Sequence, residues 1–339
     1  MAEAERLQDL GEWELIGRLG RFAPDGQFND DAALVDTAGR LVVNTDVLVE
    51  GVHFSEHTTS PQDVGWRAAA ANLSDLAAMG CDRIEGLTVG LVAPATTTWN
   101  WVQGVYEGLT ACLGRHGGIL LGGDCSSGEQ RLLAVTALGT LPAPEQAIRR
   151  SHGLPGDWLV TSGGHGLSRL GLALLRDELP AREALALDAG LRQRAMAAHQ
   201  RPQPRFDAVR ALHSSRPAGS CWRVAGTDSS DGLAAAVQAI AAASGCRGLL
   251  ERSRLPLEAA MAQLPQARPW CLSGGEDFEL VLALEPEWAR RWLRALPGSR
   301  QIGLLSEARD GTDVARIGWI GANGDPFPSD LAGFCHFRP

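Results

Sequence analysis

Carboxylates beside glycines or small polar residues recur along this chain, and most of these segments adjoin a short apolar run. The segments are residues 29–31 (NDD), 44–46 (NTD), 72–75 (NLSD), 121–125 (LGGDC), 228–232 (DSSDG) and 273–277 (SGGED). Carboxylates that are brought together repel one another unless cations lie among them. Such oxygen ligands suit Mg²⁺, which proteins typically bind through one or two carboxylates and the phosphates of a substrate. The pattern indicates a metal-dependent enzyme that handles phosphate groups.

Each of these features, taken alone, also has a purely structural interpretation. Gly-Gly-Asp and Asp-Gly are common turns, and residues 163–166 (GGHG) fit either a phosphate-binding loop or a plain turn before a helix. A lone His53 is more often structural than functional, and Arg149 and Arg150 are either solvated charges or phosphate contacts. What favours a functional interpretation is the number of acidic segments and their position after apolar runs, because ligands of α/β sheets gather at strand ends.

The basic residues limit the chemistry further. The sequence contains no lysine, so all 31 basic residues are arginine. This excludes a P-loop lysine, a protein-kinase lysine and a Schiff base. The net charge of −9 argues against nucleic acid or an anionic membrane as a partner. It does not exclude an anionic nucleotide, because bound Mg²⁺ would reverse the local charge.

Cysteine usage and hydropathy favour a cytoplasmic protein. The seven cysteines are scattered and show no zinc-ligand spacing, so we expect reduced thiols. No run of about 18 apolar residues is present, so we expect no membrane span. The first 20 residues are charged and predict no signal peptide.

The elements that would position the acidic residues are alternating strands and helices. Residues 41–43 predict a strand that ends at Asn44, Thr45 and Asp46, and residues 60–63 predict the start of a helix that runs to about residue 79. On that helix Asn72 and Asp75 should share a face. Further strands are expected at 87–92, 119–121 (ending at Gly122, Gly123 and Asp124), 131–139, 157–161 and 278–284, and helices at 97–115, 181–200 and 231–243. Residues 142–156, with three prolines and two glycines, predict a domain boundary.

Taken together, the motifs resemble the thiamine-monophosphate kinase family, within the superfamily of aminoimidazole-ribonucleotide synthetase-like ATP-binding proteins. The most specific segments are residues 72–80 (NLSDLAAMG) and 273–280 (SGGEDFEL). Other matching segments follow in the family's order along nearly the whole chain: 30–34 (DDAAL), 45–54 (TDVLVEGVHF), 122–124 (GGD), Arg150 before 155–157 (PGD), 201–205 (RPQPR), 228–233 (DSSDGL) and 333–337 (GFCHF).

The resemblance implies an α/β (α+β) fold with two domains. Residues 1–145 would form an N-terminal domain that binds ATP and metal and dimerises, with a mixed sheet and with helices at the dimer interface. Residues 146–339 would form the C-terminal, synthetase-like α/β domain. The family is a homodimer whose N-terminal sheets meet across the two-fold axis, so a homodimer is implied here as well.

The resemblance also implies an activity and a set of site residues. The activity is the ATP-dependent phosphorylation of thiamine monophosphate to thiamine diphosphate by direct in-line transfer, assisted by several Mg²⁺ ions. Metal ligation falls to Asp31, Asn44, Thr45, Asp46, Asp75, Asp124, Asp228 and Asp231, among which Asp46, Asp124 and Asp231 are implied as catalytic. ATP contacts fall to Tyr106, Gly123, Asp124, Arg150 and Ser230, and contacts to thiamine monophosphate fall to His53, Glu276 and Phe334.

Two departures and two alternatives accompany the resemblance. The usual Gly-Ile-Gly-Asp-Asp segment is Gln27-Phe28-Asn29-Asp30-Asp31 here, and the usual Ser-Thr-Asp is Asn44-Thr45-Asp46. One alternative is another enzyme of the superfamily, such as aminoimidazole-ribonucleotide synthetase, selenophosphate synthetase or the hydrogenase-maturation carbamoyl dehydratase. The other is a non-catalytic module that binds nucleotide or metal, against which the intact aspartate set argues.

Overall fold

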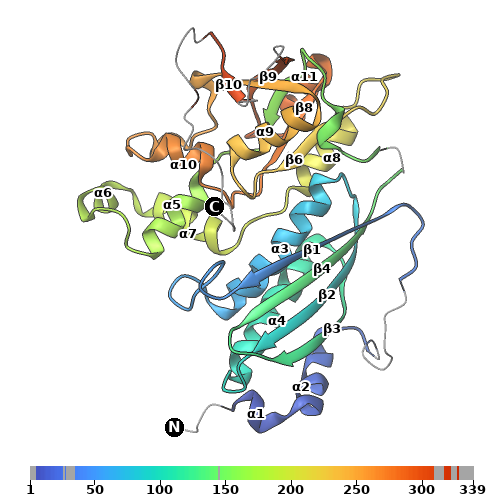
Figure 1. The fold of residues 1–339 in the computed structure, drawn as a ribbon, viewed down its shortest axis with the longest axis vertical. Coiled ribbons are helices and arrows are strands. Elements are labelled where there is room, and N and C mark those ends of the chain that lie inside the picture. The colour runs from blue at the N-terminus through green and yellow to red at the C-terminus, as the bar shows by residue number, and fades with distance from the viewer. Residues whose placement is uncertain are drawn as a thin grey trace. The chain divides into compact units, whose positions relative to one another are not determined.

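The computed structural model describes residues 5–25, 27, 35–143, 146–308, 317–321 and 327 (Figure 1). The chain forms two compact units, Met1–Leu76 with Cys81–Pro144, and Ala77–Gly80 with Glu145–Pro339. Each unit contains a sheet with helices packed against it, which confirms the expected α/β class.

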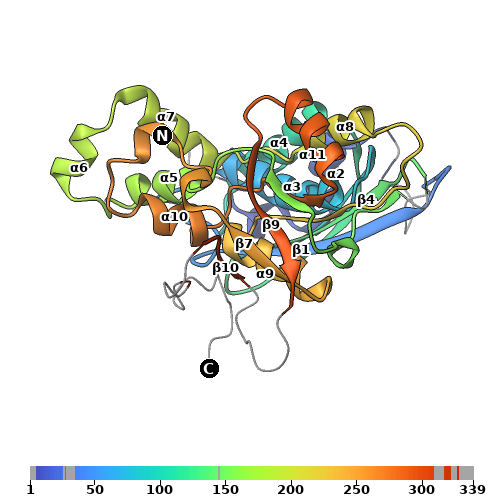
Figure 2. The same ribbon diagram turned by 90° about the horizontal axis from the view of Figure 1, so that it is seen from above.

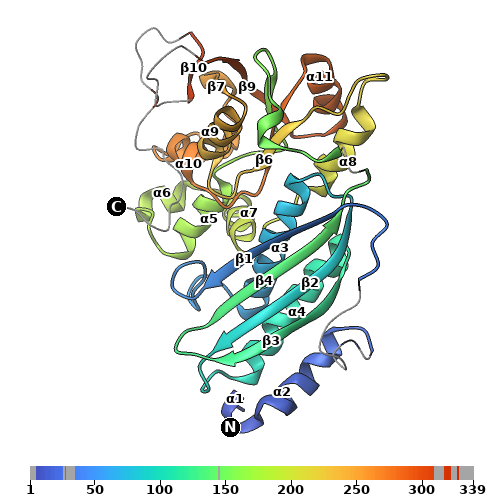
Figure 3. The ribbon, with the colours of Figure 1, turned by 45° about the vertical axis from the view of Figure 1, so that its right-hand side comes forward.

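The first unit is built on a four-stranded sheet in the order β1-β4-β2-β3 (Figure 3). β4 pairs antiparallel with both β1 and β2, whereas β2 pairs parallel with β3, so the sheet is mixed as expected. The strands are β1 (Leu41–Val49), β2 (Arg83–Ala93), β3 (Ile119–Ser127) and β4 (Leu132–Thr140).

Two long helices, α3 (Pro61–Ala78) and α4 (Trp99–His116), cover one face of this sheet (Figure 3). They approach closely because glycines stand at the crossing. A Cβ on Gly65 would lie 1.8 Å from the Val105 carbonyl oxygen, and one on Gly108 would lie 1.9 Å from that of Gln62. The short elements α1 (Leu7–Leu10), α2 (Glu12–Leu19) and η1 (Gly20–Phe22) precede the sheet.

The second unit contains a six-stranded sheet in the order β10-β7-β9-β5-β8-β6. All neighbouring strands are antiparallel except β10 and β7. The strands are β5 (Trp158–Thr161), β6 (Ala225–Asp228), β7 (Cys246–Leu250), β8 (Leu280–Leu284), β9 (Arg300–Glu307) and β10 (Ile317–Trp319).

Helices α9 (Leu233–Ala243) and α11 (Pro286–Ala295) pack against this sheet, and α8 (Phe206–Ser215) packs on α11. The indole nitrogens of Trp288 and Trp292 on α11 donate to carbonyl oxygens of α8 at 3.1 and 3.0 Å. Helices α5 (Leu167–Leu175), α6 (Ala181–Ala186), α7 (Ala189–Gln200) and α10 (Ala267–Ser273) gather to one side (Figure 2), around a separate small core. The 3₁₀ turns are η3 (Arg150–His152), η4 (Arg252–Arg254) and η5 (Ala259–Met261).

Most predicted elements are present, but two strand ends were predicted wrongly. Asp46 was expected at the end of a strand, yet β1 continues to Val49 because its last residues pair with Leu132–Ala134 of β4. Asp124 was likewise expected after a strand, yet β3 runs on to Ser127 beside β2. Both aspartates are therefore strand residues, and the alternation of the strand decides which way their side chains point.

Candidate active site

The first group of polar side chains lies in the first unit, between β1 and α3. The Asn44 amide donates to Asn72 Oδ1 at 3.0 Å and to Asp75 Oδ2 at 2.9 Å. The backbone N–H of Asp46 also donates to Asn72 Oδ1, at 3.2 Å. Asn72 and Asp75 thus point the same way from α3, as their spacing predicted, and both contact the strand that carries Asp46.

The same contacts leave one oxygen that suits a cation. Both amide hydrogens of Asn44 point at acceptors, and its buried Oδ1 has no hydrogen-bond partner. A buried acceptor without a donor is costly unless a ligand satisfies it. Within the described ranges no group of three or more His, Cys, Asp or Glu side chains could hold a metal. The side chains gathered here, Asp46 and Asp75 with Asn44 and Asn72, offer carboxylate and amide oxygens, which fit Mg²⁺ that also binds substrate phosphates.

Thr45 lies on the opposite face of the sheet from Asn44 and Asp46. Its hydroxyl is 2.7 Å from that of Thr136, its partner across β4. Asp124 is in register with Gly90 of β2, which is in register with Ala134 of β4. Ala134 in turn lies opposite Val47 of β1. Val47 and Thr45 are two residues apart on the same strand and share a face, so Asp124 points to the same outer face as Thr45.

Asp46 and Asp124 of one chain are therefore far apart. β4 and β2 lie between their strands, which puts them about 14 Å apart at about 4.8 Å per strand. Two oxygens on one Mg²⁺ lie within about 4 Å of each other, given metal–oxygen distances of about 2.1 Å. Within one chain, the first unit thus separates the two aspartates into different sites.

The second group lies in the second unit, where two acidic segments meet that are far apart in the sequence. Asp228 ends β6 and is buried, and the Ser230 hydroxyl donates to its Oδ1 at 3.1 Å. The carbonyl oxygen of Ser230 accepts the backbone N–H of Glu276 at 2.7 Å. A Cβ on Gly275 would lie 2.8 Å from that carbonyl oxygen, so the close contact requires glycine.

The backbone around Glu276 is strained. Glu276 and Phe278 have φ angles of 57° and 52°, which residues other than glycine rarely adopt. Asp277, between them, accepts the backbone N–H groups of Gly166 at 2.7 Å and Ser168 at 3.1 Å, at the start of α5. Burial raises the pKa of the Asp277 carboxyl to about 7, although these two hydrogen bonds oppose the rise. Strained backbone held by its surroundings is typical of functional sites.

The Glu276 side chain has a defined neighbour. Its Oε2 lies 3.4 Å from Nδ1 of the buried His199, whose Nδ1 is also 3.3 Å from the Ser168 hydroxyl. A carboxylate so placed can accept hydrogen bonds from an amine or ring N–H of a ligand.

The remaining predicted residues are placed as follows. Arg150 donates through Nε to the Thr227 hydroxyl at 3.3 Å, one residue before Asp228. His53 Nδ1 accepts the Val49 N–H at 3.0 Å, which closes the turn after β1. Tyr106 is buried in α4, and burial raises its pKa.

Four further predicted residues have limited structural counterparts. Gly123 cannot be larger, because a Cβ would lie 2.1 Å from the Val89 carbonyl oxygen. Asp231 is exposed, just before the start of α9. Asp31 and Phe334 lie outside the described residues.

Several side chains that support the second group were assigned no role in the sequence analysis. Ser229, fully buried, bonds to the Glu279 backbone and to His165, and Arg205 pairs with Glu279. The available signal was a charged residue between Phe278 and Leu280 at the start of an apolar strand, because a charge there needs a partner.

Comparison with known proteins decides the family. The family model for the AIR synthase related protein, N-terminal domain, matches residues 29–141. The thiamine-monophosphate kinase of Prochlorococcus marinus is 48% identical over 304 residues, which cover 89% of this chain and 90% of that protein. The chain belongs to the thiamine-monophosphate kinase family.

Solved structures of this family agree with the fold. The thiamine-monophosphate kinase of Stenotrophomonas maltophilia K279a is 30% identical and has a TM-score of 0.75, covering 92% of this chain and 97% of that one. AaThiL complexed with AMPPCP and TMP is 27% identical and has a TM-score of 0.72, covering 99% of this chain and 100% of that one. The expected synthetase-like α/β fold is thereby confirmed.

One residue that departs from the thiamine-monophosphate kinase pattern, Gln27, makes a hydrogen bond to the first sheet. The side-chain amide of Gln27, which stands where the family usually has glycine, donates to the Leu121 carbonyl oxygen at 3.0 Å. Leu121 lies on β3, three residues before Asp124. The change from glycine therefore adds a tether to the strand that carries Asp124.

Proposed function

We propose that this chain transfers the γ-phosphoryl group of ATP to thiamine monophosphate and so forms thiamine diphosphate. The observation that carries the proposal is its similarity, over almost its whole length, to AaThiL complexed with AMPPCP and TMP. The polar groups around Asp46 and Asp228 supply the oxygen ligands that such a reaction needs.

The proposed roles follow the chemistry of each side chain. Asn44, Asp46 and Asp75 in the first unit, and Asp228 and Asp231 in the second, would hold Mg²⁺, together with Asp31, Thr45 and Asp124. Arg150, Tyr106, Gly123 and Ser230 would contact ATP. His53, Glu276 and Phe334 would contact thiamine monophosphate.

The reaction needs no general base. The acceptor phosphate, with a second pKa of about 6, is already anionic at neutral pH. One of its oxygens attacks the γ-phosphorus, the bond to the bridging oxygen breaks, and ADP leaves. When bound, Mg²⁺ would neutralise the repulsion between the two polyanions. Arg150 holds positive charge beside the Asp228 turn, and the strained Glu276 segment orients the acceptor.

The test is ATP consumption with and without thiamine monophosphate, with thiamine diphosphate measured as product. We expect consumption only when the acceptor is present, in a one-to-one ratio with product. Acceptor-independent hydrolysis, or no turnover with bound nucleotide, would instead support another superfamily activity or a non-catalytic binding module.

We also propose that the enzyme is a homodimer joined through the outer face of the first sheet. Leu41, Val43 and Val47 of β1 are 41%, 56% and 43% exposed on that face. Neighbouring positions on β4 continue it with Ala134 and Leu138. An exposed apolar sheet face of this kind marks an interaction surface. Because Thr45 and Asp124 lie on it too, a second copy packed there would share the metal sites.

Val43→Asp is expected to convert the dimer to a monomer, because it would bury a charge in the centre of the proposed interface. Sedimentation equilibrium measures the mass directly. Leu185→Asp, at an apolar residue that is 77% exposed on α6, serves as the matched control and should leave the mass unchanged. A Val43→Asp protein that stays dimeric would place the interface elsewhere.

We place the reaction in the cytoplasm. The support is the state of the cysteines, since the six that the structure describes are all unpaired. Among the described residues, no helix has the length and apolar character needed to span a bilayer.

A further inference from the structure

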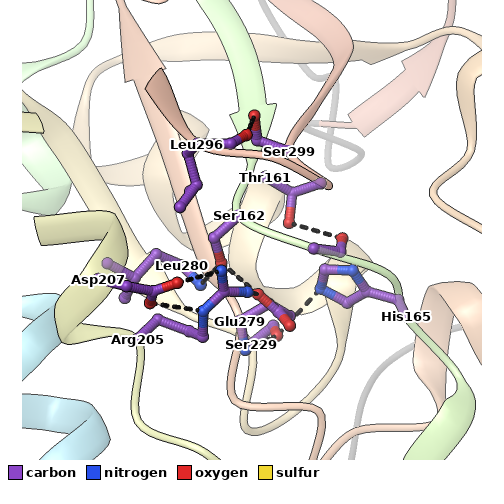
Figure 4. Close-up of polar contacts among 11 residues, drawn as sticks. Thr161, Ser162, His165, Arg205, Asp207, Ser229, Glu279, Leu280, Leu296 and Ser299 are labelled. Carbon is purple, nitrogen blue, oxygen red and sulfur yellow. Dashed lines mark hydrogen bonds and ion pairs between the residues drawn. The ribbon is translucent and has the colours of Figure 1, made fainter. Parts of the chain in front are cut away.

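A mostly buried ion pair joins Arg205 and Glu279 (Figure 4). The backbone of Glu279 contacts Ser229, which belongs to the turn that carries Asp228 and Asp231. Arg205 donates through Nη1 to Glu279 Oε2, and these side chains are 14% and 15% exposed. On its other side Arg205 binds Asp207 at 2.8 and 2.9 Å, but that carboxylate is 48% exposed. Arg205 therefore has one inner and one outer partner.

The side chain of the inner partner, Glu279, also contacts the loop of residues 162–163. Its Oε2 also accepts the Ser162 hydroxyl, and Ser162 Oγ accepts the Leu280 N–H at 2.8 Å. A Cβ on Gly163 would lie 2.4 Å from the Glu279 carboxylate, so this loop leaves room for it only as glycine. Burial raises the pKa of the Glu279 carboxyl, and the charge of Arg205 opposes that rise.

The backbone of Glu279 holds the turn itself. Its N–H donates to Ser229 Oγ at 3.1 Å, and Nε2 of the buried His165 lies 3.0 Å from the same hydroxyl (Figure 4). Ser229 is fully buried and stands between Asp228 and Ser230 in the chain. Its carbonyl oxygen accepts the Gly232 N–H at 3.0 Å, which closes the turn. Ser229 is thus the inward anchor of a turn whose neighbours carry the acidic groups.

We propose that Glu279, fixed by Arg205 and Ser162, is a positioning residue that sets the turn of residues 228–232 through Ser229. The inference rests on the proposed function for the use of that turn, because Asp228 and Asp231 would bind Mg²⁺ there and Ser230 would contact ATP. No part of Glu279 or Arg205 needs to touch a substrate. The ion pair acts indirectly, by holding the turn in the conformation that places Asp228 and Asp231.

The energetics favour a role in placement over one in stability. A buried ion pair often adds little net stability, because desolvation of both charges offsets their attraction. Removing a group that orients metal ligands nevertheless lowers metal affinity or activity by about 10- to 100-fold. Breaking the Arg205–Glu279 pair is therefore expected to weaken metal binding by more than the accompanying loss of stability would explain.

The first test is amide hydrogen exchange of the peptide that spans residues 225–235, in the whole protein. Ser229→Ala removes the anchor and leaves the ion pair, and Glu279→Gln removes the charge from the pair. Both should accelerate exchange at residues 229–232 by about tenfold. Asp207→Asn, which removes only the outer partner of Arg205, should leave exchange in this peptide at the wild-type rate.

Three exchange results would overturn the proposal. One is an unchanged rate in Ser229→Ala, and a second is an equal acceleration in Asp207→Asn and Glu279→Gln. Acceleration spread evenly over the second unit would also overturn it, because that result means lost global stability. If Glu279→Gln does not fold, Ser229→Ala decides the matter alone.

The second test measures Mn²⁺ affinity by electron paramagnetic resonance with AMPPCP bound. Glu279→Gln and Ser229→Ala should weaken Mn²⁺ binding by about 10-fold or more, and Asp207→Asn should not. Equal Mn²⁺ affinities in all variants would remove the positioning role. A wild-type protein that makes no thiamine diphosphate would refute the proposed function, whereas the exchange result would still judge the anchor itself.

Discussion

Asp46→Asn is expected to lower kcat by at least about 100-fold and to leave the fold intact. The Asp46 side chain is on the helix-covered face of β1, where the unpartnered Asn44 oxygen and Asp75 also lie. Asparagine keeps the size of the side chain and removes its charge, so the loss should be in charge compensation of the phosphates. Initial rates at saturating ATP and acceptor, with circular dichroism of the same preparation, measure both effects.

A matched variant separates a local role from a general charge effect. Asp82→Asn removes one carboxylate from an exposed position just before β2 of the same unit. It should retain the wild-type kcat. If Asp46→Asn is folded and turns over normally, Asp46 does not belong to the site; if both variants fail alike, the effect is not specific to the Asp46 position.

The Asp46 result depends on a feature that the sequence could not give. Local signals predicted α3 almost to the residue, because a serine before Pro61 and a glycine at position 80 mark its ends. They ended β1 too early, because the apolar run of residues 41–43 stops at the polar residues Asn44, Thr45 and Asp46. Only pairing with β4 keeps these polar residues in the strand, and such pairing is a long-range property that local propensity does not encode.

For the site, too, features set by local geometry could be predicted from the sequence, whereas features set by long-range pairing could not. The shared face of Asn72 and Asp75 follows from helix geometry, and the structure confirms it. That Thr45 and Asp124 point to the outer face follows only from register, since a shift of one residue reverses every side chain. The links from Ser229 to Glu279 join residues 50 positions apart, so no spacing rule could reveal them.

The strained segment that follows Ser273 should also make stability depend on pH through Asp277. Burial raises the pKa of this carboxyl to about 7, against about 3.9 in an unfolded chain. Between these values the folded state holds a proton that the unfolded state has lost, so the stability contribution falls as pH rises. It is fully present below about pH 4 and absent above about pH 7, with a slope of up to about 1.4 kcal/mol per pH unit.

Asp277→Asn isolates that contribution, because asparagine has nearly the same shape and does not titrate. The free energy of unfolding in urea should be measured for both proteins at pH 5, 6, 7 and 8. We expect the wild type to lose about 3 kcal/mol relative to Asp277→Asn between pH 5 and pH 8, with most of the change below pH 7. Other groups that titrate equally in both proteins cancel in this difference. A difference that stays constant over the whole range would mean that the carboxyl is ionised in the folded protein throughout. In that case its two hydrogen bonds from the start of α5 outweigh its burial.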